Sequence, residues 1–532
     1  MLLQRSSHRS PALPALTACC LAALLAFQLT GCAVGPNYHR PAVAVPASYK
    51  EAPEGWKVAQ PADQADRGPW WTIYQDAQLN TLEDQLSQNN QTIAQYAAAY
   101  RQARALVSEA RAAYFPVIGA SGSGARSRTA ITNSGAPTSL AIGNSFSFGL
   151  QASWEPDLWG RISRTVSAQE ASQQGAAANL ANARLSAQAT LAQTYFTLRS
   201  LDAQQKLLDD TVTAYQKSLQ LTQNRYAQGV AGQADVVQAQ TQLESAQAAA
   251  IDNGVARAQD EHAIAVLVGQ PASTFSIPPS PLDATPPAVP LQVPSALLER
   301  RPDIAAAERA AASANEQIGV AISAFFPSLT LSASGGVQNS VFSSLFALPW
   351  RFWTLGPSLA ETIFDAGLRY AQTQAARAAY DQQVAAYRQT VLAAFQDVED
   401  NLASQRILAQ EVAVQQQAVE SAQHALTIIL NEYKAGTTDY LNVLSAQTTA
   451  FAAQQKLDSL AGERMVSSAG LVKALGGGWD VSQMARETGS VTAPAPDATS
   501  SVVASAADPV AASAASAVSA SVAPATSVQP VQ

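Results

Sequence analysis

One stretch of this sequence occurs twice, and each copy has the pattern of a turn between two long helices. The first copy runs from 224 to 241 and the second from 431 to 448, with Asn, Tyr, Gly, Val and Ala-Gln-Thr at matching positions. Long proline-free runs lie on both sides of each copy, and Gly229 or Gly436 stands where the chain must reverse. Since glycine adopts reversed backbone conformations without steric cost, we predict an internal duplication with two helical hairpins whose tips lie near these glycines.

A second repeated pattern predicts a β-hairpin before each helical hairpin. Residues 145–155 alternate large apolar side chains with small or polar ones, which is the period of a strand with one apolar face. The alternation returns in 328–337, and weaker partners lie at 117–125 and 353–364. Four strands are therefore predicted, and Pro357 inside the last of them fits best at a bulge or a strand end.

The composition excludes several classes of function. The formal net charge is −8 and charged residues make up only 14% of the chain, whereas nucleic-acid binding needs a basic footprint. All three cysteines lie near the N-terminus, and the four histidines lack the spacing of metal ligands. Asp157 and Asp365 suggest a carboxylate pair, but each lies just before a helical run, where capping explains it. We therefore expect no metal, no cofactor, no nucleic-acid partner and no enzyme.

The N-terminus has the organisation of a lipoprotein signal peptide. Arg5 and Arg9 precede an apolar run that is too short to span a membrane, and Leu-Thr-Gly-Cys follows, ending at Cys32. This tetrapeptide is similar to the bacterial lipobox, in which cleavage before the cysteine is followed by acylation with fatty acids such as palmitate. The similarity implies that Cys32 is the lipid attachment site, and Ala33 after it favours transfer to the outer membrane.

These patterns divide the chain into segments. Each repeat is predicted to hold a short helix, a β-hairpin and a long helical hairpin; the first short helix covers 79–113, and the β-hairpins cover 116–156 and 327–364. The proline-rich linker is expected not to be helical, and the Ala/Ser/Val/Pro tail is expected to be disordered. In order, the segments are a signal peptide (1–31), an extended N-terminal segment (32–76), repeat 1 (77–270), the linker (271–302), repeat 2 (303–479) and the tail (480–532).

Four strands with one apolar face can cross an outer membrane, but four strands cannot close a barrel. An open sheet edge in lipid leaves unpaired backbone groups, each of which costs several kcal/mol. More than one chain must therefore contribute, and three chains would supply twelve strands. The expected fold class is an α+β membrane protein, internally duplicated, with four β-strands and two long helical hairpins per chain.

Further motifs add a family resemblance. They are 32–38 (CAVGPNY), Trp70-Trp71 with Asp76, 154–161 (WEPDLWGR), 298–304 (LERRPDI) and 363–367 (IFDAG). With the two tips, these motifs resemble the outer membrane efflux proteins of the TolC/OprM type, in the lipoprotein (NodT-like) branch of the outer membrane factor family. The resemblance covers the chain from Cys32 to about Trp479.

That resemblance implies a homotrimer with a twelve-stranded β-barrel in the bacterial outer membrane and a long α-helical barrel in the periplasm. It implies a passive conduit of the multidrug-resistance kind, which receives small toxic compounds from a periplasmic adaptor and an inner-membrane pump of the RND type. It also assigns roles at the tips, because Gly229, Val230, Gly436 and Thr437 match the motif with which the family contacts its adaptor.

The resemblance is incomplete at the pore constriction. In secretion-type relatives, an arginine just after the second tip pairs with an aspartate of the neighbouring hairpin, and further aspartates form a ring. Here Asp235 keeps the aspartate of that pair, but Thr438 stands at the arginine position and Asn442 and Ser445 stand at the ring positions.

Other residues must then hold the constriction. We expect the tip to be held by hydrogen bonds and by packing of Tyr433 and Tyr440, with Asp439 as the carboxylate that gives the pore a preference for cations. The alternative is that Asp439 only caps the returning helix.

Two other functions fit part of the pattern. A type I protein-secretion conduit would use the same helical barrel, and a coiled-coil periplasmic lipoprotein, adaptor or adhesin would explain the helices and the anchor but not four alternating strands. No motif identifies the exported compound, or the particular pump and adaptor.

Overall fold

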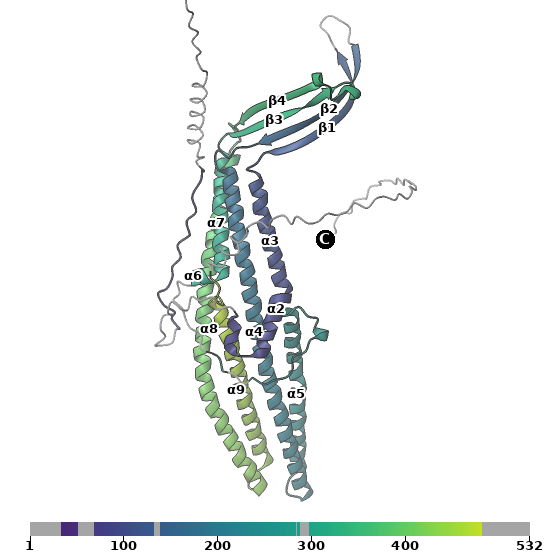
Figure 1. Ribbon diagram of the computed structural model, residues 1–532. Helices are drawn as coiled ribbons and strands as arrows, with labels where there is room; N and C mark the ends of the chain where they lie inside the picture. Colours follow the sequence, from purple (N-terminus) through teal and green to yellow (C-terminus); the bar gives the residue numbers. More distant parts are fainter. Residues whose placement is uncertain (1–32, 52–68, 132–138, 283–284, 288–296, 481–532) are drawn as a thin grey trace, which may run out of the picture. The chain divides into compact units, whose positions relative to one another are not determined.

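The computed structural model describes residues 33–51, 69–131, 139–282, 285–287 and 297–480 (Figure 1). All of these belong to one compact unit, Met1–Thr488. The predicted signal peptide, Cys32 and nearly all of the C-terminal tail lie outside the described residues, as does part of the linker.

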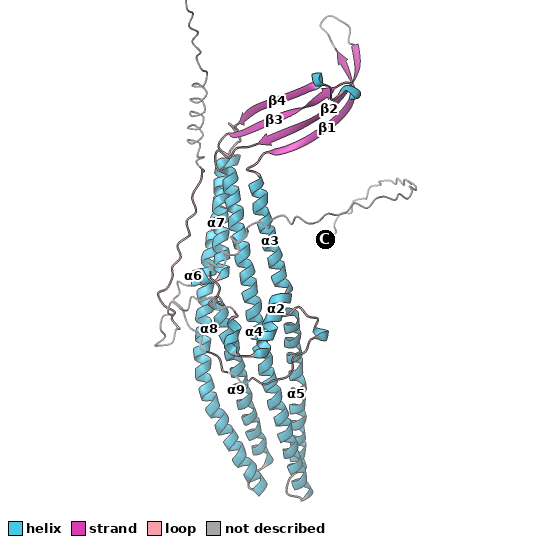
Figure 2. Ribbon diagram, in the orientation of Figure 1, coloured by secondary structure: helices cyan, strands magenta, loops and turns pink. Residues whose placement is uncertain are grey.

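The four predicted strands form one antiparallel sheet in the order β1-β2-β3-β4 (Figure 2). The strands of the first hairpin are longer than the alternation indicated. The last strand starts two residues earlier and ends four residues earlier than the predicted range 353–364. The strands are β1 (Val117–Ile131), β2 (Ser139–Trp154), β3 (Ser328–Asn339) and β4 (Arg351–Ala360).

Pro357 lies inside β4, in register with Leu331 of β3, and not at a bulge or a strand end. Among the described strands of this chain β4 pairs with β3 alone, and the register between them continues through Pro357 without a bulge. The expectation for this proline was therefore wrong in its position.

Two helical hairpins follow the two β-hairpins. The first consists of α4 and α5 and the second of α8 and α9; α4 and α8 contain 67 and 68 residues, so each is about 100 Å long. In the part of the chain that the structure describes, no helix is both long and apolar enough to cross a membrane. The α-helices are α2 (Ala77–Asn89), α3 (Gln91–Ala112), α4 (Arg161–Ala227), α5 (Gln233–Leu267), α6 (Leu297–Arg300), α7 (Pro302–Ser323), α8 (Leu368–Ala435) and α9 (Tyr440–Ala474).

The predicted helix over 79–113 is broken in two at Asn90, which corrects the prediction of a single helix. The Asn90 side chain accepts a hydrogen bond from the backbone N–H of Ile93 at 3.0 Å and so caps α3. Its amide nitrogen donates to the carbonyl oxygen of Leu267 in α5 at 2.8 Å. A contact with a distant helix therefore determines where the chain bends.

The linker also differs from its prediction, because α6 occupies Leu297–Arg300 near its end. The prolines of the linker end at Pro294, and the next one, Pro302, occupies the first turn of α7, where proline is tolerated. A short helix between these two prolines meets no steric obstacle.

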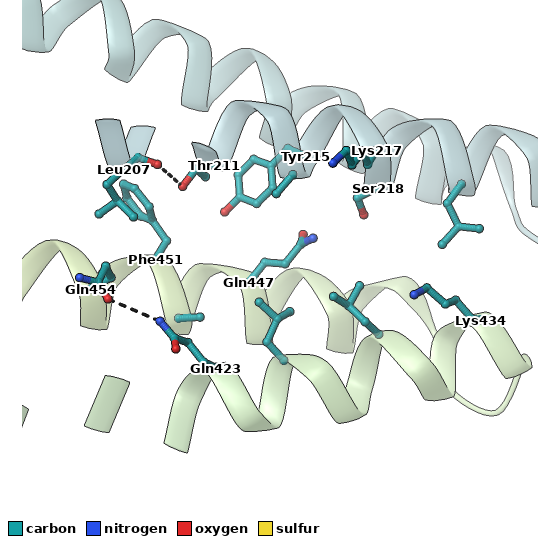
Figure 3. A pocket seen from close by; sticks show the side chains of 15 residues that line it. Leu207, Thr211, Tyr215, Lys217, Ser218, Gln423, Lys434, Gln447, Phe451 and Gln454 are labelled. Carbon is teal, nitrogen blue, oxygen red and sulfur yellow. Dashed lines mark hydrogen bonds between the residues drawn. The ribbon is translucent and has the colours of Figure 1, made fainter. Parts of the chain in front are cut away.

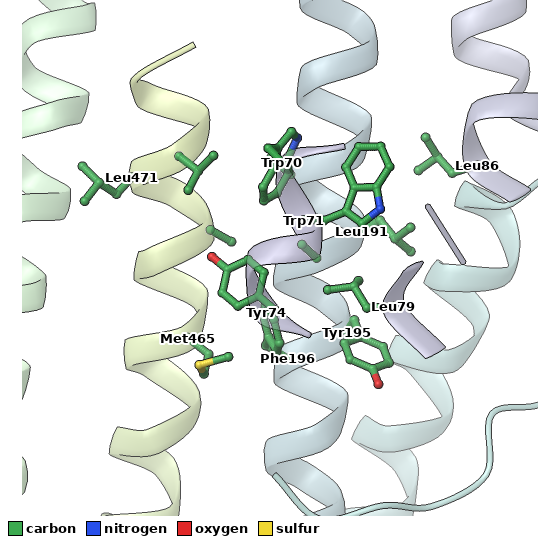
Figure 4. Packing of buried hydrophobic residues seen from close by; sticks show 14 of the residues in the cluster. Trp70, Trp71, Tyr74, Leu79, Leu86, Leu191, Tyr195, Phe196, Met465 and Leu471 are labelled. Carbon is green, nitrogen blue, oxygen red and sulfur yellow. The ribbon is translucent and has the colours of Figure 1, made fainter. Parts of the chain in front are cut away.

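The largest apolar core lies where both repeats meet the N-terminal segment. Trp70, Trp71 and Tyr74, on the 3₁₀ helix η2 (Trp70–Tyr74), are all buried. They pack against Phe196 of α4 and Met465 of α9 in the cluster of Figure 4. The paired tryptophans are therefore packing anchors that tie the N-terminal segment to the helical body.

A buried ion network holds the start of the linker against the first helical hairpin. The Asp202 carboxylate, 1% exposed, accepts hydrogen bonds from Arg199 at 3.0 Å and from Arg257 of α5 at 2.7 Å. It also accepts from the backbone N–H of Ser280 at 2.9 Å. Both guanidinium groups donate in turn to backbone carbonyl oxygens of the linker, at Ile277 and Pro278.

Glu83 of α2 is fully buried, and neither of its carboxylate oxygens has a hydrogen-bond partner. Burial first, and the nearby Asp84 second, raise the pKa of Glu83 to about 9. The folded protein thus keeps a proton that the unfolded chain releases above its ordinary pKa, so the free energy of unfolding falls as the pH rises between those two values.

We therefore expect Glu83→Gln to stabilise the protein by about 2–3 kcal/mol at pH 7 to 8 and to have no such effect near pH 4. Urea unfolding followed by tryptophan fluorescence at both pH values measures this. The control is Glu109→Gln, at an exposed carboxylate on α3, which should change little. Equal effects of Glu83→Gln at the two pH values would contradict the explanation.

Candidate functional site

One face of the sheet is apolar and exposed. Residues paired across antiparallel strands share a face, and the register pairs Leu150 with Gly335 and Trp154 with Leu331. On that same face, Trp353 is 81% exposed and Leu355 is 74% exposed. The opposite face carries small or polar residues, including Ser147, Gln151, Ser153, Ser332, Ser334 and Thr354.

Within the described part of this chain, the sheet has two edge strands that pair on one side only, and the layer of long helices has two outermost helices. The order β1-β2-β3-β4 leaves the outer sides of β1 and β4 without a strand among the described residues. In the layer of long helices, α4 packs against α5 and α9, and α9 packs against α8. The outermost helices of the layer are therefore α5 and α8.

Both outermost helices expose apolar residues at coiled-coil spacing. On α5, Val237, Ile251 and Val255 are 55%, 77% and 55% exposed, and on α8, Ile407 and Val414 are 51% and 68% exposed, seven residues apart. Steps of four, seven and fourteen place side chains on one stripe of a helix. Each outermost helix thus has an apolar stripe that can pack against another helix.

The first described residues lie against the junction of the sheet and the helices. The Arg164 side chain of α4 is 8% exposed and donates to the Glu316 carboxylate at 2.8 Å. It also donates to the carbonyl oxygens of Gly35 and Pro36, at 3.3 and 3.2 Å. A Cβ on Gly35 would lie 2.6 Å from the Cα of Gly319, so the segment needs glycine there.

Ala33 is close to the turn between β2 and α4. A Cβ on Gly160, just before α4, would lie 2.8 Å from the Cα of Ala33. The backbone N–H of Val34 donates to the carbonyl oxygen of Trp159 at 3.1 Å. Cys32 itself is outside the described residues, but the residue after it lies at the end of the strands.

The tip glycines adopt the conformations that the turns require. Gly229 has φ +74° and Gly436 has φ +81°, in the left-handed region that other residues disfavour. Val230 is 60% exposed, and Thr437 is exposed with its hydroxyl donating to the carbonyl oxygen of Glu432 at 3.0 Å. Both tips therefore present an exposed side chain directly after the glycine.

The two hairpins meet just above their tips around two buried tyrosines. The rings of Tyr433 and Tyr440 are 2% and 1% exposed and contact each other edge to face at 5.8 Å. The Tyr433 hydroxyl lies 3.2 Å from the hydroxyl of Thr222 on α4. Both rings thus point into the contact between the hairpins, which we name the tip junction, and contribute packing.

Arg225 completes the tip junction, and the sequence analysis missed it. Its guanidinium carbon lies 4.4 Å from the centre of the Tyr433 ring, and the group donates to the Tyr433 carbonyl oxygen. The equivalent residue of the second copy is Glu432. That difference in charge between otherwise similar copies is the signal that would have identified Arg225.

The two candidate constriction aspartates both act at helix starts. The Asp439 carboxylate accepts from the backbone N–H of Asn442 at 3.2 Å and caps α9. Asp235 accepts from the backbone N–H of Gly232 at 3.1 Å, at the start of α5. Asp439 remains exposed, so capping leaves its charge in solvent. No metal-binding cluster of His, Cys, Asp or Glu occurs among the residues that the structure describes.

The other carboxylates considered above are also caps. Asp157 accepts from the backbone N–H groups of Ile162 and Ser163, at 3.0 and 2.7 Å, at the start of α4. Asp365 accepts from the backbone N–H of Gly367 at 3.0 Å, and its salt bridge to Arg369 lowers its pKa. Both carboxylates therefore have structural partners at equivalent places in the two repeats.

Comparison with known proteins gives a consistent family. Residues 82–270 and 293–477 match the family model described as outer membrane efflux protein. The toluene efflux pump outer membrane protein TtgC of Pseudomonas putida is 33% identical over 478 residues, covering 89% of this chain and 98% of that protein. The cation efflux system protein CusC of Escherichia coli is 30% identical over 463 residues, covering 86% and 97%. The solved structure of the outer-membrane channel OprN has a TM-score of 0.78 at 28% identity, covering 84% of this chain and all of that one.

Proposed function

This chain belongs to the outer membrane efflux protein family, and on that basis we propose that it is the passive trimeric conduit of a tripartite efflux system. It is an outer-membrane channel and not an enzyme. In the proposal, a periplasmic adaptor and an inner-membrane pump, of the RND type, deliver small toxic compounds to its helical tips. The observation that carries the proposal is that the free sides of β1 and β4 and the exposed apolar stripes of α5 and α8 have no partner within the described part of one chain.

The sheet supports a shared barrel in the outer membrane. Its apolar face matches contact with lipid, while its face of small and polar residues matches a wet interior. The free sides of β1 and β4 need partners in lipid, and a neighbouring copy offers the complementary edge. Three copies give the twelve strands of the family barrel.

The helices support the same assembly below the membrane. The stripe on α5 with Ile251 and the stripe on α8 with Ile407 and Val414 are exposed in one chain. Packing of α5 of one copy against α8 of the next buries both stripes and continues the helical layer into a closed barrel.

The names of the relatives favour small compounds over proteins as cargo. The relatives are named for toluene efflux and cation efflux, and the described sheet distinguishes this chain from a coiled-coil adaptor. We infer small toxic compounds as the substrate class.

A planar bilayer experiment tests the conduit and the constriction together. We expect the purified trimer to form channels with small resting conductance and cation preference, because Asp439 remains exposed on the turn after the second tip. Asp439→Asn should weaken cation selectivity and block by multivalent cations, while α9 keeps its cap because asparagine also caps helices. Asp252→Asn, an exposed carboxylate on α5, serves as the control. No channels at all would refute the conduit, and unchanged selectivity in Asp439→Asn would refute only the role of Asp439.

We also propose that Cys32 carries lipid at the membrane surface. The position of Ala33 beside Gly160, in the connection between β2 and α4, supports this proposal. Because a barrel and acyl chains anchor the same protein twice, Cys32→Ser with a substitute signal peptide should still give outer-membrane trimers, at wild-type yield but without the lipid mass. Membrane fractionation and intact-mass measurement check this. Loss of all trimer would show that the anchor is needed for assembly.

A further inference from the structure

A cavity of about 430 Å³ lies between the two helical hairpins, just above the tip junction. Its walls come from α4, α8 and α9, as Figure 3 shows. Tyr215 and Phe451 give it aromatic surface, and Leu426 and Leu430 add aliphatic surface. Leu430 also packs against the tip junction, so the cavity and that junction share a wall.

Two buried side chains that line this cavity each have a polar atom without a hydrogen-bond partner among the described residues, the Ser218 hydroxyl and the Gln447 amide oxygen. Gln447 of α9 is 6% exposed, and its amide oxygen has no hydrogen-bond partner. In Figure 3 the amide lies between α9 and α4, on the side where Ser218 is labelled. An unpaired buried acceptor is unfavourable, and a ligand with a donor would remove that cost.

The charge at the cavity has one sign. Of the described residues that line it, the charged ones are Lys217 of α4 and Lys434 of α8. Both ammonium groups are exposed, and neither has an ion-pair partner within the described part of the chain. The two lysines line the cavity from different hairpins, so both contribute positive charge to it.

We propose that this cavity binds a small amphipathic organic anion, with an aromatic body, one anionic group and one hydrogen-bond donor. The aromatic body fits among the apolar walls, and the anionic group lies near Lys217 and Lys434. The donor satisfies the amide oxygen of Gln447. Because the ligand contacts α4 as well as α8 and α9, its binding braces the two hairpins in the arrangement that the tip junction defines.

The probe for this site is anilinonaphthalene sulfonate, which has two aromatic ring systems, a sulfonate and one N–H donor. Its fluorescence is titrated with the full-length protein in lipid nanodiscs, with N-phenylnaphthylamine as the neutral analogue. We expect saturable binding of one probe per chain. In Lys217→Gln with Lys434→Gln, affinity for the sulfonate should fall about tenfold or more while affinity for the neutral analogue is kept. Gln447→Leu should weaken both probes.

Two further variants separate this cavity from other apolar surface. Ala214→Phe fills the cavity from an exposed position and should remove the saturable binding. The control is Lys206→Gln with Lys456→Gln, which removes the same charge from α4 and α9 outside the cavity and should leave binding unchanged. The proposal is overturned if the two lysine-pair variants bind the probe alike. It is also overturned if Ala214→Phe binds the probe as the wild type does, which would be the result if side chains of a partner fill the cavity. Since the measurement involves no export, its outcome is independent of the proposed conduit.

Discussion

Export is expected to stop in a chain that carries Val230→Arg together with Thr437→Arg. Both positions are exposed and immediately follow the tip glycines, and the variant keeps both glycines, which have positive φ. The fold should therefore survive, while the surface proposed to meet the adaptor gains two bulky charges. In a strain that depends on this channel, drug or solvent tolerance should fall to that of the deletion strain at wild-type trimer yield.

The matched control for the tips is Gln216→Arg with Gln416→Arg. These positions are also exposed and lie on α4 and α8, the helices that lead into the two tips, so the added charge is equal but lies away from the tips. Export should persist in this control. If the tip variant exports as well as the control does, the tips do not contact the adaptor.

Asp202→Ala should destabilise the protein by about 3–5 kcal/mol, since it leaves the buried Arg199 and the partly buried Arg257 without their shared carboxylate. Arg199 would then keep the Pro278 carbonyl oxygen and the Tyr195 ring as partners, and Arg257 would keep the Ile277 carbonyl oxygen and the Glu261 carboxylate at 3.4 Å. Residues 277–280 at the start of the linker should then detach from α4 and α5. Urea unfolding measures the loss of stability, and limited proteolysis measures the exposure of the linker.

Two comparisons make the Asp202 experiment specific. Asp209→Ala removes an exposed carboxylate from the same helix and should cost less than 1 kcal/mol. Replacing Arg199, Asp202 and Arg257 together by Met, Leu and Met should restore most of the stability, because apolar residues of similar volume leave no buried charge behind. A stable Asp202→Ala protein with a protected linker would show that the network does not hold the linker.

The parts of the fold that follow from a period or a single residue could be predicted. Alternation over 145–155 predicts β2 with its apolar face, because a period of two has only one structural meaning. The repeated glycines at 229 and 436 predict the two turns, which need positive φ. The sheet and the two helical hairpins are confirmed in this way.

The features that depend on distant partners could not be predicted. The break at Asn90 rests on a hydrogen bond to Leu267, far away in the sequence, and the residues on both sides of it continue one helical pattern. The linker contains no periodic signal that would reveal its link to Asp202.

The candidate site also contains residues that the sequence identified and residues that only the structure revealed. The sequence identified Tyr433 and Tyr440 as packing residues, whereas Arg225 became apparent only when its contact with Tyr433 brought the two hairpins together. The cavity beside the tip junction could not be foreseen, because its walls come from three separate helices.

The tip junction also shows what it means for both repeats to be encoded in one gene. In a ring of separate half-length chains, symmetry would force the same residue into every equivalent position. Covalent fusion removes that restriction, so that arginine stands at 225 and glutamate at the equivalent position 432. The arginine joins the two halves of one molecule through Tyr433. Contacts within a subunit and contacts between subunits can therefore evolve separately. Selection can strengthen the contacts within a subunit while the contacts between subunits stay weak enough to open.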